Sequence, residues 1–223
     1  MFKQDNYQII RGLISKEIAN IAYKYLLNKR RITKFMHDQR LVSPFNDHWG
    51  RLQDDQVPGA WCNYDDLLMA TLLQTCKEKI EKEIDIKLVE TYTYTRIYIF
   101  GNVLDRHKDR PSCAVSSTMA LGGDPWPIYV EPTGKGVVQY NEKGEADNYE
   151  PSSEPGIKVE LSPGDCLLYK GCEIEHWRDK FYGENCAQVF LHYNDASDPK
   201  AKENEYDNRP FLGLPNSVRG YYK

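Results

Sequence analysis

Three residues in the second half of the chain have types and spacing suited to binding a metal ion. His107 and Asp109 form an H-x-D pair within "VLDRHKDRPSC" (103–113), and His176 ends "LSPGDCLLYKGCEIEH" (161–176). Two histidines and one carboxylate on one face leave three coordination positions open, the arrangement used for oxygen chemistry at non-haem Fe(II). An H-x-D pair alone is weak evidence, because ordinary charged loops contain such pairs by chance. The alternative is a solvated charged loop, and the surrounding elements have to decide.

The residues before each histidine predict strands that would position these side chains. "ETYTYTRIYIF" (90–100) is β-branched and aromatic without a helical period, which is typical of a strand. His107 and Asp109 follow it after a short turn, and at a strand period of two both point to the same face. His176 follows a Pro-Gly turn, a predicted strand and a chain-breaking glycine, so it is the best candidate for a third ligand.

The rest of the chain predicts helices first and short strands afterwards. Segments 15–29, with Ser15 as N-cap, and 64–84 have the apolar period of helices, and 36–62 between them is irregular. Segment 141–156 is polar and predicts a surface loop or flap. This layout favours a jelly roll or related barrel with helices against one sheet. Further strands are predicted at 113–123, 126–131, 136–140, 157–161, 166–171, 173–178 and 186–194.

Length and composition predict one domain over 1–223. We expect a helical support region at 1–89, a β core at 90–195 and a C-terminal extension at 196–223, since no linker divides the chain. Apolar residues make up 40% and charged residues 28%, which suits a globular protein. The net charge of −4 argues against a nucleic-acid binder dominated by phosphate contacts.

The sequence also predicts a location. No apolar run is long enough for a transmembrane helix, and "MFKQDNYQIIRG" lacks the apolar core of a signal peptide. We therefore expect a cytoplasmic protein without a membrane partner, whose six cysteines are reduced and mostly buried. The oligomeric state is left open.

Three segments together resemble the Fe(II)/2-oxoglutarate-dependent dioxygenases, specifically the prolyl-4-hydroxylase-like branch. "RIYIFGNVLDRHKDR" resembles the branch's tyrosine, glycine and H-x-D arrangement, "SPGDCLLYKGCEIEHW" its second-histidine region, and "GENCAQVFLHYND" its last core strand. The likeness covers about residues 92–195. It implies a mainly β, α+β fold with a double-stranded β-helix (jelly-roll) core and N-terminal supporting helices. It also implies Fe(II), 2-oxoglutarate and O2 as cofactors and cosubstrates.

Position by position, the resemblance makes His107, Asp109 and His176 the iron ligands. Tyr98 stands where the branch often has a tyrosine lining the 2-oxoglutarate pocket, although a core tyrosine on a strand is an equal alternative. Trp126 and Trp177 are more typical of core packing than of a substrate pocket wall.

The chain departs from the family pattern at the anchor for the distal carboxylate of 2-oxoglutarate. The family usually has an arginine or lysine there, and this chain has "NCA" at 185–187. An unpaired buried carboxylate is costly, so another group must replace it. Our order of candidates is Arg178, Arg96, Gln188 and then His192; for each arginine a structural ion pair is the alternative.

The resemblance implies an oxygenase that hydroxylates an unactivated C–H bond and releases succinate and CO2. The substrate is either a peptidyl proline or a small molecule, and Arg110 is a candidate partner for a substrate carboxylate. A second hypothesis is a cupin-type metal enzyme that does not use 2-oxoglutarate. A third is a jelly-roll binding module without metal, which predicts that His107 and His176 lie far apart.

Overall fold

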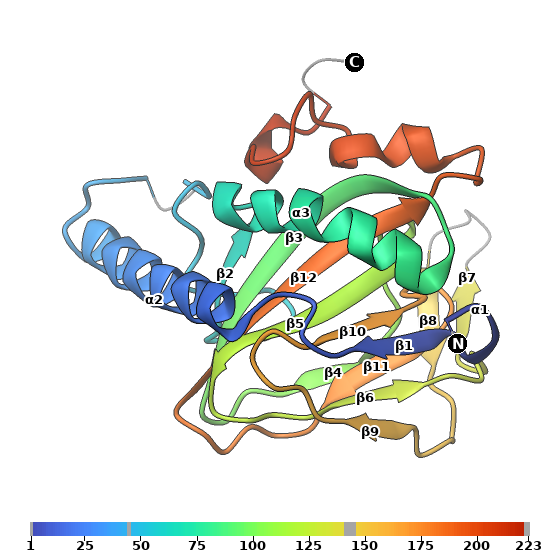
Figure 1. Cartoon of the computed structure of the whole chain (residues 1–223). Coiled ribbons are helices and arrows are strands. Elements are labelled where there is room, and N and C mark those ends of the chain that lie inside the picture. Colours follow the sequence, from blue (N-terminus) through green and yellow to red (C-terminus); the bar gives the residue numbers. More distant parts are fainter. Residues whose placement is uncertain (1, 44–45, 141–145, 221–223) are drawn as a thin grey trace.

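The computed structural model of the chain describes residues 2–43, 46–140 and 146–220. Figure 1 shows a larger and a smaller β-sheet, with the long helices on the outer face of the larger one. The helices are α1 (Phe2–Asp5), α2 (Lys16–Asp38) and α3 (Leu67–Ile84), and short 3-10 turns are η1 (Pro111–Cys113), η2 (Ala201–Asp207) and η3 (Asn216–Val218). This architecture agrees with the predicted mainly β fold with supporting helices.

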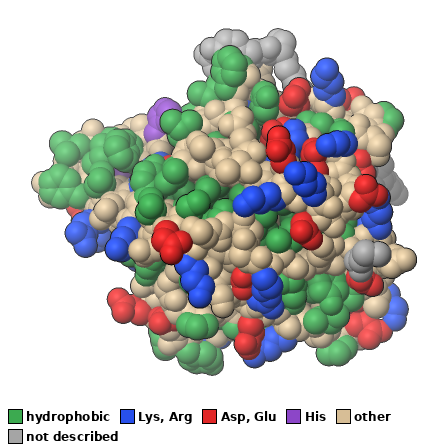
Figure 2. All heavy atoms as spheres, in the orientation of Figure 1, with side chains coloured by type: hydrophobic (Ala, Val, Ile, Leu, Met, Phe, Trp, Pro, Cys, Tyr) green, Lys and Arg blue, Asp and Glu red, His purple; other side chains and the backbone are tan. Residues whose placement is uncertain are grey.

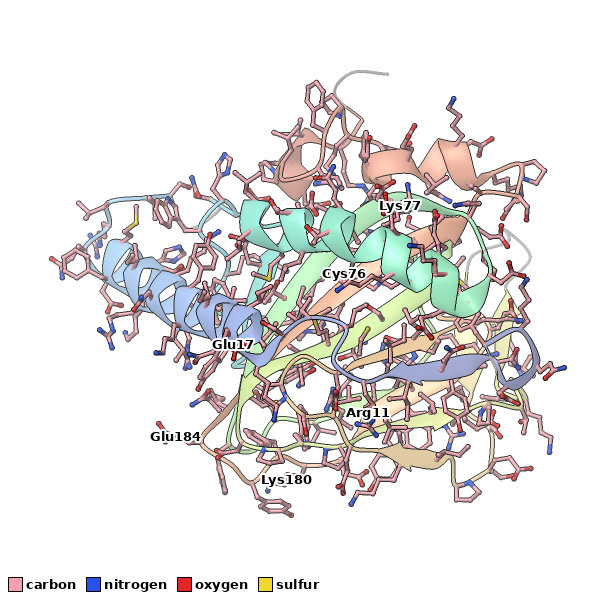
Figure 3. The ribbon with its side chains drawn as sticks, viewed as in Figure 1. Arg11, Glu17, Cys76, Lys77, Lys180 and Glu184 are labelled. Atoms are coloured by element: carbon pink, nitrogen blue, oxygen red, sulfur yellow. The ribbon has the colours of Figure 1, made fainter. Side chains whose placement is uncertain are left out.

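The two long helices begin where the sequence provides caps. The Ser15 side chain accepts a hydrogen bond from the Ile18 N–H, as predicted, and Asp66 caps α3 in the same way. The apolar faces of both helices join the main hydrophobic core with the larger sheet. Figure 3 shows Cys76 on the side of α3 that faces this sheet, where it is buried. The helices therefore brace the sheet from outside and leave its inner face free.

The larger sheet has six strands and all its neighbouring pairs are antiparallel. Across the sheet they lie in the order β1 (Tyr7–Ile10), β10 (Cys166–Tyr169), β5 (Val115–Gly123), β12 (Asn185–Asp195), β3 (Leu88–Ile99) and β2 (Trp61–Tyr64). The strands predicted around 90–100, 113–123, 166–171 and 186–194 are thus confirmed. Because β3 and β12 are long neighbours, they carry matched rows of inward-facing side chains from one end of the barrel to the other.

The smaller sheet has four strands: β4 (Leu104–His107), β11 (Glu175–Arg178), β6 (Ile128–Glu131) and β9 (Ile157–Val159), in that order. A separate hairpin pairs β7 (Val137–Tyr140) with β8 (Ala146–Glu150). Apolar side chains from β6, β9 and β10 form one cluster, so the two sheets pack face to face. The strands that carry both predicted histidine ligands therefore belong to the smaller sheet.

Two sequence-based expectations need correction. The N-terminal region was expected to be helical, but it also supplies β1 and β2 to the larger sheet, because short strands at a sheet edge carry too little periodic signal. Segment 141–156 was expected to be a loop, but Ala146–Glu150 pair with β7; residues 141–145 lie outside the described part. The polar composition of that segment did not indicate that part of it pairs with β7 as a strand.

The C-terminal extension is fastened to the barrel by the buried carboxylate of Asp207. Arg110 donates to both Asp207 oxygens at 2.8 and 2.7 Å, Ser112 Oγ donates at 3.0 Å, and Tyr64 Oη also donates. Burial raises the pKa of Asp207, but the hydrogen bonds from Arg110 and Tyr64 outweigh it and lower the pKa to about 2. The extension is thereby tied to the loop that directly follows Asp109.

Replacing Asp207 by asparagine is expected to lower the free energy of unfolding by about 1–3 kcal/mol, since it removes charge-assisted hydrogen bonds to a buried carboxylate whose arginine partners are partly exposed. The folded-state pKa lies below the ordinary 3.8, so the wild type keeps this contribution above about pH 4 and loses it as the pH falls toward about 2. Urea unfolding of both proteins between pH 6 and about 2 measures this. A stability difference that stays constant down to the lowest pH would contradict the assignment.

The surface of α2 carries several exposed apolar side chains. Figure 2 shows hydrophobic side chains gathered at the end of the molecule that α2 forms, with charges of both signs spread over the remaining visible face. The exposed apolar residues of this helix are Ile18, Ile21, Ile32 and Phe35. Among the residues that the structure describes, no helix is both long and apolar enough to span a bilayer.

Candidate active site

The register between β4 and β11 brings the two predicted histidines together. His107 and His176 are direct cross-strand partners, so their side chains leave the sheet on the same face. Their ring centroids lie 4.2 Å apart. Asp109 Oδ1 lies 3.7 Å from His107 Nε2 and 3.4 Å from His176 Nε2. The ligand atoms of all three residues lie within 4.8 Å of one another, a spacing that one metal ion can bridge. The metal-free hypothesis, which required distant histidines, is therefore wrong on this point.

Both imidazoles present Nε2 to Asp109. The Nδ1 of His107 lies 2.7 Å from the Asp105 carbonyl oxygen, which fixes an Nδ1–H tautomer and leaves a lone pair on Nε2. The Nδ1 of His176 faces the Ile174 carbonyl at 3.5 Å. Burial lowers the pKa of His176, so this ring is neutral near pH 7. Neutral imidazole is the form that binds a metal.

Asp109 is held on its second oxygen, which leaves Oδ1 to face the histidines. Ser116 Oγ on β5 donates to Asp109 Oδ2 at 2.6 Å, and His192 Nδ1 on β12 lies 3.0 Å from the same Oγ. The backbone N–H of Asp109 donates to the Gly171 carbonyl at 2.8 Å. A Cβ on Gly171 would lie 2.5 Å from Asp109 Oδ2, so only glycine fits this close approach. The loop between β10 and β11 therefore positions the carboxylate as well as His176.

Replacing Ser116 by alanine is expected to weaken Fe(II) binding about 10- to 100-fold, because outer hydrogen-bond partners orient metal ligands. Competition with a chromophoric chelator measures the affinity. The neighbouring Ser117 points to the opposite face of β5 and accepts the Leu191 N–H at 3.1 Å. Ser117→Ala is thus a matched control that should lower stability and leave the affinity for Fe(II) unchanged. Equal affinities in the wild type and Ser116→Ala would show that Asp109 needs no such support.

A cavity of about 160 Å³ adjoins these side chains between the two sheets. Its wall combines aromatic and apolar side chains with a few polar groups, which is typical of a small-molecule site. Beside His107, Asp109 and His176, the lining residues are Gln56, Tyr92, Tyr94, Arg96, Leu104, Ile128, Tyr169, Phe190 and His192.

Arg96 lines this cavity but already has a carboxylate partner. Its Nε lies 2.9 Å from Asp54 Oδ2, its Nη2 lies 3.1 Å from Asp54 Oδ1, and Nη2 also donates to Gln56 Oε1 at 2.7 Å. Burial alone would raise the pKa of Asp54, but the charge and hydrogen bonds of Arg96 outweigh this effect and lower the pKa. The carboxylate therefore stays ionised. Arg96 thus has the structural ion pair that its sequence-based alternative described.

Arg178 is the opposite case, a buried guanidinium without an acidic partner among the described residues. It donates to the Trp126 carbonyl and, at 3.3 Å, to Thr118 Oγ1, which in turn donates to Gln188 Oε1 at 3.2 Å. Its Nε has no hydrogen-bond partner, and neither has the buried Oη of Tyr98. Two unpartnered polar atoms in one buried region are the pattern expected where a polar ligand is meant to bind.

Arg178, Tyr98 and Gln188 are buried and do not belong to the lining of this cavity. The Tyr98 ring and the Arg178 guanidinium both pack on Trp126, with centroid distances of 4.7 and 5.1 Å. Burial raises the pKa of the Cys186 thiol, and the nearby positive charge of Arg178 opposes that rise. Cys186 occupies one of the positions where the resembling family usually has its cation. The guanidinium of Arg178 therefore reaches that region from β11 instead of β12.

A second group of side chains shares Asp109 but is less suited to a metal. Ligand atoms of Asp109, Cys113 and His192 also lie within 4.8 Å of one another. Burial raises the pKa of the Cys113 thiol well above its usual value, and Tyr92 Oη lies 3.1 Å from its sulfur. Since the thiolate is the metal-binding form, this cysteine is disfavoured as a ligand. Burial lowers the pKa of His192 to about 4, which keeps it neutral beside Ser116.

The charged residues next to the histidines are structural. Arg106 donates to Glu175 Oε2 at 3.0 and 2.6 Å and stacks on Trp177, whereas Lys108 donates to the carbonyls of Gly134 and Gly136. Trp126 is buried in a core cluster, as favoured from sequence. These contacts brace β4 and β11 from outside the cavity.

Sequence reasoning missed several residues of this region. Ser116 and Gln56 stand in segments without a metal or cosubstrate motif, and Tyr169 belongs to the second-histidine segment but was not singled out; only the tertiary structure places all three beside the cavity. The one usable signal was that residues an even number apart on the last strand share a face. It pointed to Gln188 and His192.

Comparison with known proteins gives structural similarity only. No family model matches the chain, and no curated protein matches its sequence. A prolyl-4-hydroxylase from Pseudomonas putida superposes with a TM-score of 0.54 at 11% identity, covering 88% of this chain and 96% of that one. SnoN, an α-ketoglutarate-dependent epimerase from nogalamycin biosynthesis, superposes with a TM-score of 0.60 at 16% identity, covering 87% and 80%.

HygX from Streptomyces hygroscopicus, whose structure contains nickel and 2-oxoglutarate, has a TM-score of 0.53 at 14% identity, covering 88% and 85%. At such identities the likeness shows the fold, which is the double-stranded β-helix of these oxygenases. The predicted fold class is confirmed.

Proposed function

We propose that the protein is an Fe(II)- and 2-oxoglutarate-dependent oxygenase that hydroxylates an unactivated C–H bond. The observation that carries this proposal is the cross-strand pair His107 and His176 with Asp109 Oδ1 facing both Nε2 atoms. Two imidazoles and one carboxylate match the donor set preferred by non-haem Fe(II). The similar folds of prolyl-4-hydroxylase, SnoN and HygX support the same chemistry.

In this proposal His107, Asp109 and His176 would hold the metal, next to the cavity that they help to line. With its cosubstrates bound, the metal supplies the oxidising chemistry, and 2-oxoglutarate leaves as succinate and CO2. The protein's part is to fix the ligands and exclude water from the reacting centre. Ser116 orients Asp109, while the apolar wall from Leu104, Ile128 and Phe190 keeps the site dry.

We assign the distal carboxylate of 2-oxoglutarate to Arg178. Arg178 stands two residues after His176 on β11, so both side chains enter the barrel on the same face, about 7 Å apart along the strand. Among the described residues its guanidinium has no acidic partner, and Tyr98 Oη is a second buried group there without a hydrogen-bond partner. Arg96 is the weaker candidate because Asp54 already neutralises it. Gln188 supports Arg178 through Thr118.

We also propose a reducing, cytoplasmic location. All six cysteines are free, and five of them are buried. Labelling of thiols in freshly lysed cells, with and without reductant, tests this directly.

The test of the function is an anaerobic titration of metal-free protein with Fe(II), followed by 2-oxoglutarate. The proposal expects a visible charge-transfer band that saturates with one 2-oxoglutarate for each iron. Iron binding without a band would favour a cupin-type metal enzyme that does not use 2-oxoglutarate. An absence of iron binding would rule out both functions.

A further inference from the structure

A second hollow adjoins the cavity beside the candidate metal ligands. It has a volume of about 540 Å³, and the two hollows share Tyr92 and Tyr94 in their walls. The Tyr92 ring lies 4.5 Å from the His192 ring on one side and stacks on Tyr64 at 5.0 Å on the other. The Tyr92 and Tyr94 side chains therefore separate this second hollow, which we call the outer groove, from the cavity that His107 and Asp109 line.

One wall of the outer groove carries a surplus positive charge. Arg110 and Arg219 both line it and share a single carboxylate, Asp207, with Arg110 at 2.7 Å and Arg219 at 3.3 Å. One negative charge cannot neutralise two guanidinium groups. Arg51, also in the wall, is matched by Asp55 at 3.0 Å, so it does not offset the surplus.

Arg219 has hydrogen-bond donors that no described residue uses. Its Nε donates to the Asp207 carbonyl at 3.2 Å, but within the described part of the chain its two terminal nitrogens have no hydrogen-bond partner. Its side chain is 39% exposed. Arg110 stacks on Tyr92 with a centroid distance of 4.5 Å, which fixes its positive charge over a ring that lines both hollows.

The outer groove also has a negatively charged hydrogen-bond acceptor, Asp47. Its carboxylate lines the same groove and makes no ion pair with any described residue; it accepts only long hydrogen bonds from Ser217, at 3.3 and 3.4 Å. An acceptor of this kind suits an ammonium or hydroxyl donor. The groove thus offers one cationic and one anionic handle.

We propose that the outer groove binds the substrate, and that this substrate is a small carboxylic acid that also carries an amino or hydroxyl group. Arg110 and Arg219 hold the carboxylate, Asp47 accepts the donor group, and Tyr92 and Tyr94 guide the carbon skeleton toward the metal ligands. A carboxylate matches the single surplus charge, whereas a phosphate would bring nearly two. The inference rests on the proposed function for its chemistry, but not for its binding.

The experiment uses three matched sets of compounds: free L-amino acids, their N-acetyl derivatives and their carboxamides. Binding is measured by saturation-transfer NMR on the full chain loaded with Zn(II) as a redox-inactive metal, with saturating 2-oxoglutarate so that its own site is filled. We expect members of the free-acid set to bind, their N-acetyl counterparts to bind more weakly, and their carboxamides to show no binding. Succinate release by the Fe(II) enzyme should rise for the same acids.

Three variants locate the binding. Arg219→Gln is expected to weaken acid binding about tenfold or more, because it removes a charged hydrogen-bond donor. Asp47→Asn should reduce the preference for free over N-acetylated acids. Arg31→Gln, an exposed arginine on α2, is the matched control and should bind like the wild type.

Carboxamides that bind as well as the acids, acids that bind Arg219→Gln as well as the wild type, or no binding by any acid would each overturn the proposal. Because the NMR measurement uses Zn(II), its result is separate from the Fe(II) titration above. If acids bind but no charge-transfer band forms, the proposed oxygenase fails and the groove assignment stands.

Discussion

Replacing Asp109 by alanine is expected to weaken Fe(II) binding by more than about 100-fold and to stop substrate hydroxylation. Losing a ligand must cost more than the roughly 10- to 100-fold typical of an outer partner. The remaining pair, His107 and His176, would be two neutral imidazoles with no negative charge to offset the metal. Isothermal titration with Fe(II) under argon, paired with product analysis, measures both effects.

Asp105→Ala is the matched control for this prediction. Asp105 belongs to the same strand β4 and is exposed, and only its backbone carbonyl contacts His107. The control should bind iron like the wild type. Because Asp109 contributes few contacts beyond Ser116 and Gly171, circular dichroism should show a folded Asp109→Ala protein. If that folded variant kept wild-type iron affinity, the metal site would have to be placed elsewhere.

Replacing Arg178 by glutamine is expected to raise the dissociation constant of 2-oxoglutarate about 30-fold to several thousand-fold. Truncating one partner of a buried, hydrogen-bonded charge pair typically costs about 2–5 kcal/mol. The carboxylate would then be left in a buried region beside the uncharged polar groups of Tyr98, Thr118 and Gln188. The intensity of the chelate band as a function of 2-oxoglutarate concentration gives the constant.

Iron affinity separates this effect from general damage. Arg178 does not contact His107, Asp109 or His176 in any hydrogen bond of the described residues, so Arg178→Gln should bind Fe(II) normally. Arg178→Lys keeps the positive charge without the planar fork and should fall between the two proteins. An unchanged 2-oxoglutarate requirement in Arg178→Gln would transfer the anchor to Arg96 or Gln188.

Local sequence signals determined much of this protein. Alternating and β-branched runs predict most of the strands. A strand buried on one face alternates polar and apolar residues, and a strand buried on both faces is apolar throughout. The H-x-D pair after one strand and a histidine after a Pro-Gly turn led to His107, Asp109 and His176. Only the register of β4 against β11 makes them neighbours, because a slip by one residue would turn one histidine to the outer face.

The sequence leaves open which charged side chains pair with one another, and the folded structure settles this. Arg96 and Arg178 both lie on predicted strands, yet Asp54 from the irregular segment 36–62 neutralises the first, and no acidic residue of the described ranges pairs with the second. Likewise, Arg110 is next to Asp109 in sequence, but its salt-bridge partner is Asp207 from the far C-terminal extension. Electrostatic neutralisation acts through space between distant segments, so composition and spacing along the chain do not encode it directly. The sequence by itself therefore determined the candidate metal ligands, while only the folded chain decided which cations remain free for a ligand.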